Sequence, residues 1–258
     1  MSTILDTIID KNREAFDRSP DRRRELESRI AERARRHSFA EALSAPRINV
    51  IAELKKASPS KGVIRADFPV ATLARELEQG GAAALSVLTE PYYFLGSLAY
   101  LQTAAATVQI PLLRKDFIFD ELQILEAAAY GADAVLLIAA ALDLPQMKDF
   151  YQCARALNLD ALCEIHDERE LDMVMDFDAD IVGINCRDLK TFKIDHALTC
   201  RLLGKIPSGK IKVAESGIHN HADIVRLRDA GAGAFLIGET VMRGEHPGEA
   251  LKELIHED

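Results

Sequence analysis

The chain contains a regular series of short apolar runs separated by stretches with helical spacing. Eight such runs, each four to six residues long, occur at positions 49–54, 84–88, 111–114, 134–138, 161–165, 181–184, 211–214 and 234–237. Between them, apolar residues recur at 3.6-residue spacing, as at Val70, Leu73 and Leu77. This alternation is typical of a parallel sheet covered by helices.

A weak internal repeat supports the same interpretation. Similar short stretches, each rich in small residues, begin at Gly80, Gly131, Asp178 and Gly231, and each lies between a helical stretch and an apolar run. Glycine suits the left-handed end of a helix, and small residues suit a tight turn into a strand. Eight such units in 258 residues favour one α/β domain, a (β/α)8 TIM barrel, over a doubly wound sheet, which usually has fewer strands.

The first 47 residues follow another pattern. Positions 11–36 hold ten basic and six acidic side chains, interspersed with a few apolar ones, and Ser19-Pro20 can begin a helix there. We interpret this segment as solvated helices and not as an RNA-binding arm. The sequence therefore predicts an N-terminal helical extension at 1–47 and a barrel at 48–258.

Bulk charge and composition exclude several partners. Acidic residues outnumber basic ones 41 to 32, a formal net charge of −9, which weighs against nucleic acid. No apolar run is long enough for a membrane span, and no signal peptide is evident. The four cysteines lack CxxC spacing, so we expect reduced thiols in a cytoplasmic protein.

The run Val50–Ser60 places charges inside a strand that should be buried. Side chains alternate along a strand, so Ile51, Glu53 and Lys55 share one face. On the inner face of a barrel, charges are tolerable only at the C-terminal mouth, where water and ligand reach them. Glu53 and Lys55 are therefore predicted to line an active site.

Other strand ends follow the same rule. By the same parity Lys115, Phe117, Glu164, Asn185, Arg187 and Glu215 should point to the same mouth. Three cations and three carboxylates would then converge on one rim.

Two loops suggest a phosphate site. Ser216-Gly217 follows the seventh run and Gly238-Glu239 the eighth, the positions where such barrels often bind phosphate on backbone N–H groups. We expect the Glu239 N–H to point inward and its carboxylate outward. His219 and His221 do not form a metal pair by spacing, and His166 is assigned a structural role.

At these residues the sequence resembles the indole-3-glycerol phosphate synthase family. The motifs that carry the resemblance are IAELKKASPS from Ile51, LTE from Leu88 with FLGS from Phe94, LRKDFI from Leu113, GINCRDL from Gly183, VAESGI from Val213 and LIGE from Leu236. They keep the family's order from residue 51 to 239, so the resemblance covers essentially the whole chain.

The resemblance implies a carboxy-lyase of tryptophan biosynthesis that needs no metal or organic cofactor. Its substrate, 1-(2-carboxyphenylamino)-1-deoxyribulose 5-phosphate, closes to indole-3-glycerol phosphate with loss of carbon dioxide and water. It also implies that the extension at 1–47 packs over the barrel mouth. We expect a monomer or weak homo-oligomer.

The resemblance also implies roles for the site residues. Lys115 is the expected general acid of the ring closure, and Glu53 is expected to hold its ammonium charged. For the dehydration, Glu164 is the expected base and Lys55 or Lys115 the expected acid. The implied catalytic set is Glu53, Lys55, Lys115, Glu164, Asn185, Glu215 and Ser216. The anthranilate part is expected to contact Ser58, Asn185 and Arg187, with Phe94, Phe117, Leu136 and Leu189 around its ring. The phosphate is expected on Lys55 and on the N–H groups of Ser216, Gly217, Gly238 and Glu239.

Three alternatives stay open at this point. A Schiff-base aldolase would use Lys115 as a nucleophile. A sugar-phosphate isomerase shares the phosphate loops but does not need the cluster of Lys55, Lys115 and Arg187. A non-catalytic phosphate-ligand binding protein does not need both an acid and a base.

Overall fold

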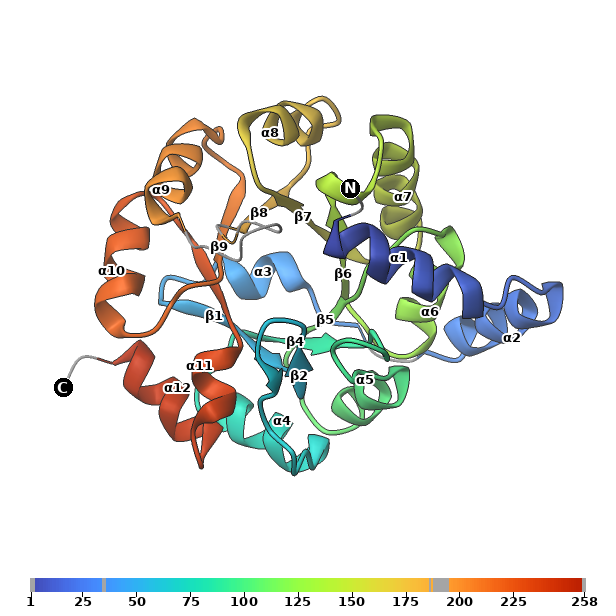
Figure 1. Ribbon diagram of the computed structural model, residues 1–258, viewed down its shortest axis with the longest axis horizontal. Helices are drawn as coiled ribbons and strands as arrows, with labels where there is room; N and C mark the ends of the chain where they lie inside the picture. Colours follow the sequence, from blue (N-terminus) through green and yellow to red (C-terminus); the bar gives the residue numbers. More distant parts are fainter. Residues whose placement is uncertain (1–2, 34–35, 186, 188–194, 257–258) are drawn as a thin grey trace.

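The computed structural model describes residues 3–33, 36–185, 187 and 195–256, and within them eight parallel strands close into a barrel (Figure 1). The order around the barrel is β1-β10-β9-β8-β7-β6-β5-β4. The strands are β1 (Asn49–Leu54), β4 (Ala84–Leu88), β5 (Leu112–Lys115), β6 (Ala134–Ile138), β7 (Asp160–Ile165), β8 (Ile181–Asn185), β9 (Ile211–Glu215) and β10 (Ala234–Ile237). The predicted (β/α)8 barrel is confirmed, and each predicted strand end lies within one residue of the observed one.

Helices follow the strands and form the outer ring seen in Figure 1. They are α4 (Val70–Gln79), α5 (Leu98–Ala105), α6 (Glu121–Ala129), α7 (Leu144–Ala156), α8 (Glu168–Met175), α9 (His196–Lys205), α10 (His221–Asp229), α11 (Glu239–Arg243) and α12 (Pro247–Ile255), with a 3-10 helix η1 (Ala139–Ala141) before α7. A small antiparallel hairpin of β2 (Ala57–Ser58) and β3 (Gly62–Val63) follows β1.

The repeated turn between helix and strand has one geometry at several places. Gly131 and Gly231 adopt φ of 97° and 108°, and Asp178 adopts 59°. The residue after each donates its N–H to a carbonyl five positions back, as Ala132 N does to Ala127 O at 2.9 Å. This hydrogen bond is typical of an α-helix that ends with one residue in the left-handed conformation. The internal repeat in the sequence therefore marks a repeated structural turn.

Alternation along the strands divides the core into two layers. Ala52 and Leu54 of β1 belong to the cluster between strands and helices, whereas Ile51 lies in the cluster inside the barrel with Leu113 and Leu162. The predicted parity is therefore confirmed, and Glu53 shares the inner face with Ile51.

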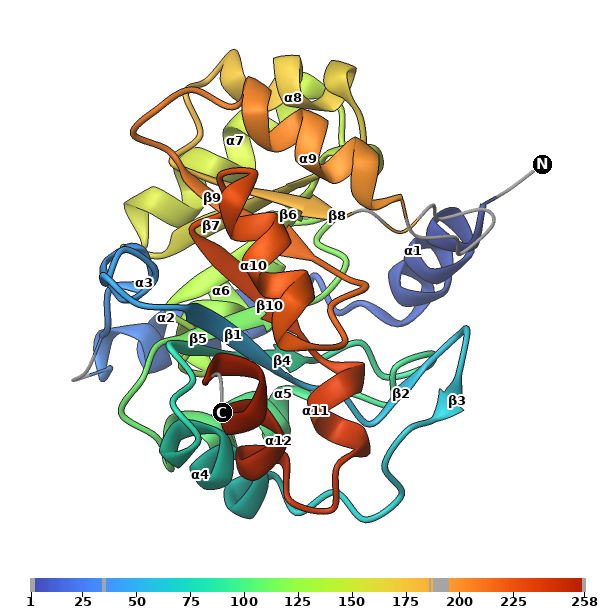
Figure 2. The ribbon, with the colours of Figure 1, turned by 90° about the vertical axis from the view of Figure 1, so that its left-hand side faces the viewer.

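The N-terminal helices do not all cover the mouth. Figure 2 shows α1 (Ile4–Ala15) and α3 (Phe39–Leu43) at opposite ends of the barrel. Phe39 and Leu43 pack into the inner cluster, and Asn49 Nδ2 donates to Leu43 O at 2.9 Å. The expectation that the extension lies over the mouth thus holds for α1 and is wrong for α3, whose two apolar side chains close the N-terminal end of the barrel.

The remaining helix of the extension, α2 (Pro20–Ala31), packs on the outside of α6. Leu26 is fully buried against Leu122 and Leu125, and Arg22 pairs with Glu126 at 2.8 Å. Ser19 caps the helix by accepting from Arg22 N at 3.2 Å, with Pro20 in its first turn, as predicted.

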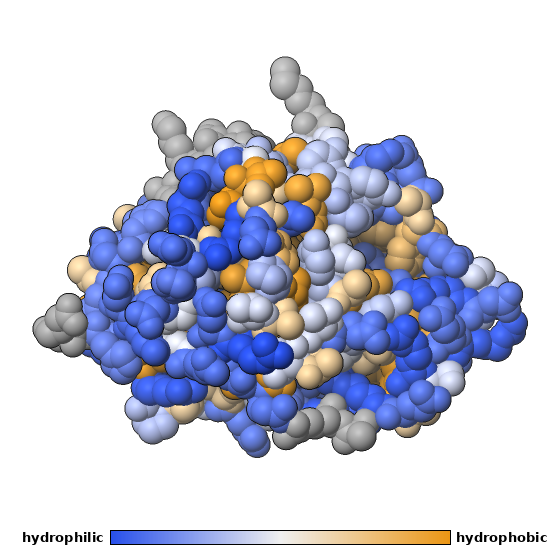
Figure 3. All heavy atoms as spheres, turned by 90° about the horizontal axis from the view of Figure 1, so that it is seen from below, coloured by the Kyte–Doolittle hydropathy of each residue, from blue (hydrophilic) through white to orange (hydrophobic). Residues whose placement is uncertain are grey.

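The face of the molecule drawn in Figure 3 is mainly hydrophilic, as expected when the apolar side chains are buried. Figure 3 shows one side of the molecule with the mouth at the top of the view; hydrophilic residues dominate it, and hydrophobic ones gather near that upper edge. Among the helices of the described residues, none combines the length and apolarity that crossing a membrane requires. Cys153, Cys163 and Cys200 are free thiols.

Candidate active site

A cavity of about 1220 Å³, including the part open to solvent, lies at the C-terminal ends of the strands. Its size suits a ligand of a few hundred daltons. Every predicted site residue that the structure describes lines it: Glu53, Lys55, Ser58, Phe94, Lys115, Phe117, Leu136, Glu164, Asn185, Arg187, Glu215, Ser216, Gly217, Gly238 and Glu239. The predicted contact Leu189 lies outside the described residues.

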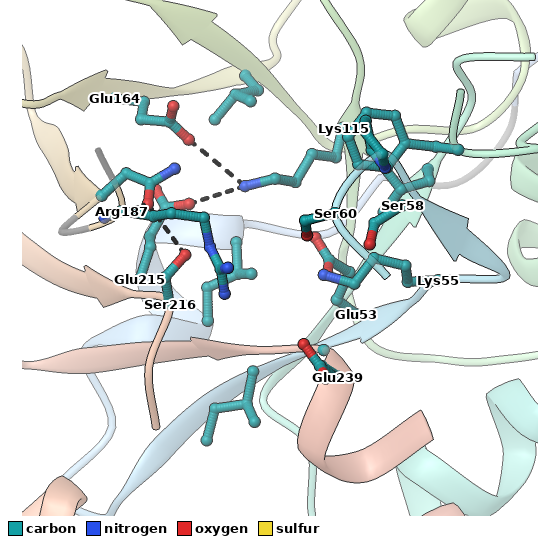
Figure 4. Close-up of a pocket in the computed structure, with 18 of the residues that line it drawn as sticks. Glu53, Lys55, Ser58, Ser60, Lys115, Glu164, Arg187, Glu215, Ser216 and Glu239 are labelled. Atoms are coloured by element: carbon teal, nitrogen blue, oxygen red, sulfur yellow. Dashed lines mark hydrogen bonds and ion pairs between the residues drawn. The ribbon is translucent and has the colours of Figure 1, made fainter. Parts of the chain in front are cut away.

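Lys115 occupies the end of β5 and points across the barrel (Figure 4). Its Nζ lies 2.7 Å from Glu215 Oε2 and 3.5 Å from Glu164 Oε2. Burial alone would lower the pKa of Lys115, but the charges of Glu215 and Glu164 outweigh it and raise this pKa above its usual range. The ammonium is thus kept charged although its side chain is largely buried.

The two carboxylates beside Lys115 differ in their protonation. Burial would raise the pKa of Glu164, but the charges of Lys115 and His166 lower it below its ordinary value. Burial raises the pKa of Glu215 to about 7, because the charge of Lys115 does not fully offset that burial and the nearby Glu164 charge adds to it. The site therefore holds one ionised carboxylate and one that exchanges a proton near neutral pH, the division seen where two acids have different tasks.

Glu53 pairs directly with Lys55, while the direct partners of Lys115 are Glu215 and Glu164. Glu53 and Lys55 both lie on the inner face at the end of β1. Glu53 adds only a weaker, more distant charge that favours ionised Lys115. A Cβ at Gly238 would collide with the Glu53 carboxylate and approach Lys55 Nζ, so this pair needs glycine beside it.

Asn185 links the ends of β8 and β9. Ser216 Oγ donates to Asn185 Oδ1 at 2.9 Å, and the same oxygen accepts from Arg187 N at 3.2 Å. Ser216 and Gly217 have φ of 64° and 70°, a left-handed conformation that is unusual for serine. The turn after β9 is therefore held in a special conformation at the cavity wall.

The loop after β10 starts α11 with Gly238 as its N-cap residue. The Glu239 carboxylate contacts Arg243 at 2.9 Å and lies 3.6 Å from Lys61 on the β2–β3 hairpin. Burial raises the pKa of Glu239, but the hydrogen bond from Arg243 and the charges of Lys61 and Arg243 together lower it overall. Two cations thus offset the charge of this carboxylate at the edge of the cavity.

An apolar wall faces the charged groups. The rings of Phe94 and Phe117 lie 5.8 Å apart between centroids, and Leu136 lines the cavity with them. The loop that carries Phe94 is fixed by the buried Glu90 carboxylate, which accepts from Phe94 N at 2.9 Å. Asn12 of α1 reaches the same carboxylate at 3.4 Å.

Sequence reasoning missed several residues of the cavity. Those it did not name include Ile4, Leu5, Ile8, Ser60, Ile138 and Leu236. The signal for α1 was present, because Leu5, Ile8 and Ile9 have helical spacing and are buried. The inner position of Leu236 also follows from parity.

His166 contacts the site, although the sequence suggested a structural role for it. Its Nε2 lies 3.4 Å from Glu164 Oε1 and its Nδ1 3.1 Å from Glu170 Oε2. His221 Nδ1 lies 2.9 Å from Leu254 O, away from the cavity. Over the described part of the chain, no group of three His, Cys, Asp or Glu side chains is arranged to hold a metal ion.

Comparison with known proteins gives a consistent result. A family model described as indole-3-glycerol phosphate synthase matches residues 5–254. The indole-3-glycerol phosphate synthase of Koribacter versatilis is 51% identical over 99% of this chain and its own full length. That of Polaromonas naphthalenivorans is 46% identical over the full length of both.

Solved structures support the fold alone. A 3-hexulose-6-phosphate synthase from Salmonella typhimurium superposes with a TM-score of 0.65 at 10% identity, covering 80% of this chain and 96% of its own. A thiamine phosphate pyrophosphorylase from Pyrococcus furiosus gives 0.61 at 18% identity, covering 84% and 96%.

Proposed function

The chain belongs to the indole-3-glycerol phosphate synthase family, and on that premise we propose that Lys115 is the general acid of the ring closure. The enzyme acts in tryptophan biosynthesis and converts 1-(2-carboxyphenylamino)-1-deoxyribulose 5-phosphate to indole-3-glycerol phosphate. The observation that carries the proposal is the buried ammonium of Lys115 between Glu164 and Glu215.

Ring closure joins an aromatic carbon to the ketone carbon of the substrate. The carbonyl oxygen gains negative charge as the bond forms, so it needs a proton from a positioned acid. Lys115 supplies that proton and becomes a neutral amine. Glu215, whose pKa is raised to about 7 by burial and whose Oε2 lies 2.7 Å away, is placed to return a proton to the amine.

Decarboxylation needs orientation more than it needs a charged group. Loss of carbon dioxide restores the aromatic ring, so the protein mainly holds the carboxylate twisted out of the ring plane and the two ends of the substrate together. We assign the carboxylate to Ser58, Asn185 and Arg187, and the ring to the wall of Phe94, Phe117 and Leu136. All six line the same cavity, and this step makes the enzyme a carboxy-lyase.

Dehydration removes the hydroxyl that ring closure created. That oxygen is the one that Lys115 protonated, so the same acid is already beside the leaving group. Glu164, kept ionised by Lys115 and His166, removes the ring proton as the base. This assignment favours Lys115 over Lys55 as the acid of the step.

Lys55 and the loops after β9 and β10 bind the phosphate in this scheme. The Ser216-Gly217 turn is left-handed at both residues and lines the cavity together with Lys55, so we assign its N–H groups to the phosphate. Gly238 keeps the backbone close to the paired Glu53 and Lys55. The N–H groups of Gly238 and Glu239 complete the proposed phosphate site.

Residues 1–47 serve in this scheme as an extension of a barrel that spans 48–258. Ile4, Leu5 and Ile8 of α1 line the cavity, so we assign this helix the task of excluding water from the ring closure. We also propose a cytoplasmic location and a monomer or weak homo-oligomer. The exposed large apolar side chains among the described residues are only Val63, Tyr92 and Leu95, which is ordinary for a monomer.

The direct test is turnover of the synthetic substrate without added metal. Indole absorbance and fluorescence should rise, and the background is low because the chain has no tryptophan. Borohydride added during turnover separates the synthase from an aldolase. A stable adduct on Lys115 would establish a Schiff base and overturn the general-acid role, whereas turnover without an adduct supports it.

A further inference from the structure

His166 forms a bridge between the catalytic cluster and α8 that the mechanism above does not use. The residue directly follows β7 and is largely buried, with its side chain 15% exposed. Its Nε2 lies 3.4 Å from Glu164 Oε1, while the other Glu164 oxygen lies 3.5 Å from Lys115 Nζ. The Glu164 carboxylate is therefore held between two cationic groups.

Glu170 fixes the other side of the ring. Its Oε2 accepts from His166 N at 2.7 Å and lies 3.1 Å from His166 Nδ1. Glu170 is itself fixed, because its N–H donates to the N-cap Asp167 at the start of α8. With Nδ1 bound to Glu170, the ring can turn only Nε2 toward Glu164.

The charged groups that face His166 come from each element around it. They are Glu164 on β7, Glu170 on α8, Glu215 on β9 and, beyond Glu164, Lys115 on β5. Burial lowers the pKa of His166, but the hydrogen bond to Glu170 and the Glu164 charge raise it overall. The ring thus carries positive charge at a higher pH than an ordinary histidine does.

We propose that His166 is a positioning residue that keeps Glu164 ionised and oriented as the base, with Glu170 holding the imidazolium ring in place. The inference rests on the proposed function in which Glu164 is the base. His166 keeps its own proton throughout: Nε2–H faces Glu164 Oε1, and Oε2, on the side of Lys115, takes the substrate proton. His166 thus adds to the charge of Lys115 in keeping the buried carboxylate ionised.

His166→Asn tests the proposal through a pH profile. Asparagine keeps a polar group near Glu170 but removes the charge beside Glu164, so the pKa of Glu164 should rise. We expect the acidic limb of kcat/KM to move to higher pH by about one unit, since one neighbouring charge commonly has an effect of this size. At pH values below the wild-type limb, kcat/KM should fall about tenfold, while kcat and KM on the pH plateau stay within about threefold of wild type.

Three further variants make the result decisive. Glu170→Gln should move the limb in the same direction by less, and the exposed His246→Asn should leave the profile unchanged. A profile of His166→Asn that superimposes on wild type, or a uniform loss at every pH, overturns the inference. Glu164→Gln distinguishes the two proposals. If that variant retained turnover, Glu164 would not be the base and the proposed function of this residue would fail, independently of His166.

A spectroscopic measurement gives a readout independent of turnover. Histidine titration followed by NMR should give His166 a pKa above 6.5 in wild type, and Glu164→Gln should lower it by removing the facing charge. An unchanged His166 titration in Glu164→Gln would contradict the coupling even if the enzyme remained active.

Discussion

Lys115 Nζ on β5 lies 2.7 Å from Glu215 Oε2 on β9, although the two residues are 100 positions apart in the chain. The two strands are not neighbours in the barrel, so their side chains meet by crossing the interior at the mouth. Glu164 on β7 completes the cluster from a third direction.

Lys115→Ala should lower kcat by about a hundredfold or more while a product-like ligand still binds. The reason is loss of the general acid, whose usual contribution is of this size. Steady-state kinetics and ligand titration check both parts. Lys148→Ala on α7 removes a surface partner of Asp176, the C-cap residue of α8; it is the matched control and should leave kcat unchanged. A kcat within tenfold of wild type in Lys115→Ala would refute the assigned role.

Gly238→Ala should weaken substrate binding, because the new Cβ collides with the Glu53 carboxylate and approaches Lys55 Nζ. We expect KM to rise at least about tenfold, the effect of losing on the order of 1.4 kcal/mol of binding energy. Gly204→Ala in α9 is the control, since its Cβ meets no atom within 4 Å, and it should stabilise that helix slightly. Equal KM values for the two variants would contradict the prediction.

Glu215→Gln should abolish most activity and yet make the protein relatively more stable as the pH rises. The folded pKa of Glu215 is raised from 4.5 to about 7 by burial. The stability linked to a raised pKa is fully present below the unfolded value of 4.5 and is lost as pH rises through 7. Wild type therefore loses stability over this window and the variant does not.

The measurement is urea unfolding of both proteins at pH 5 and pH 8. From pH 5 to pH 8, the free energy of unfolding of Glu215→Gln relative to wild type should rise by a few kcal/mol at most, since one pKa unit corresponds to about 1.4 kcal/mol. A difference that stays constant, or shifts the other way, would mean that Glu215 is ionised throughout.

Arg114→Met should destabilise the fold by about 3 kcal/mol, because it leaves buried carboxylates without their cation. Arg114 lies on the outer face of β5, 2.9 Å from Asp116 Oδ2 and 3.1 Å from Glu126 Oε2. Thermal or urea unfolding measures the loss. Arg23→Met breaks an exposed pair with Glu27 and should cost at most about 1 kcal/mol; a similar loss in both variants would contradict this account.

Much of the fold could be predicted because its signals are local. Apolar runs and helical spacing defined the strands to within one residue, and the turn residues Gly131 and Gly231 marked the helix ends. The two-residue strands of the β2–β3 hairpin gave no such signal, since a pattern of alternation needs a longer segment. The positions of α2 and α3 also escaped, because a short amphipathic helix can pack on any complementary surface.

The candidate site divides in the same way. Parity along single strands predicted that Glu53, Lys115, Glu164 and Glu215 face one mouth, because side-chain alternation is a property of each strand alone. Which of them touch was not predictable: Lys115 meets Glu215 and Glu164, whereas Glu53 meets Lys55. The contact of His166 with Glu164 was missed for the same reason.

Local sequence patterns therefore define the strands, the inward face of each and the chemical groups at the mouth. The pairing of those groups depends on the folded barrel, because the stagger of its eight tilted strands sets how far each side chain reaches across it. The same packing also sets the protonation of the two acids, since the charges of Lys115 and His166 keep Glu164 ionised whereas burial raises the pKa of Glu215.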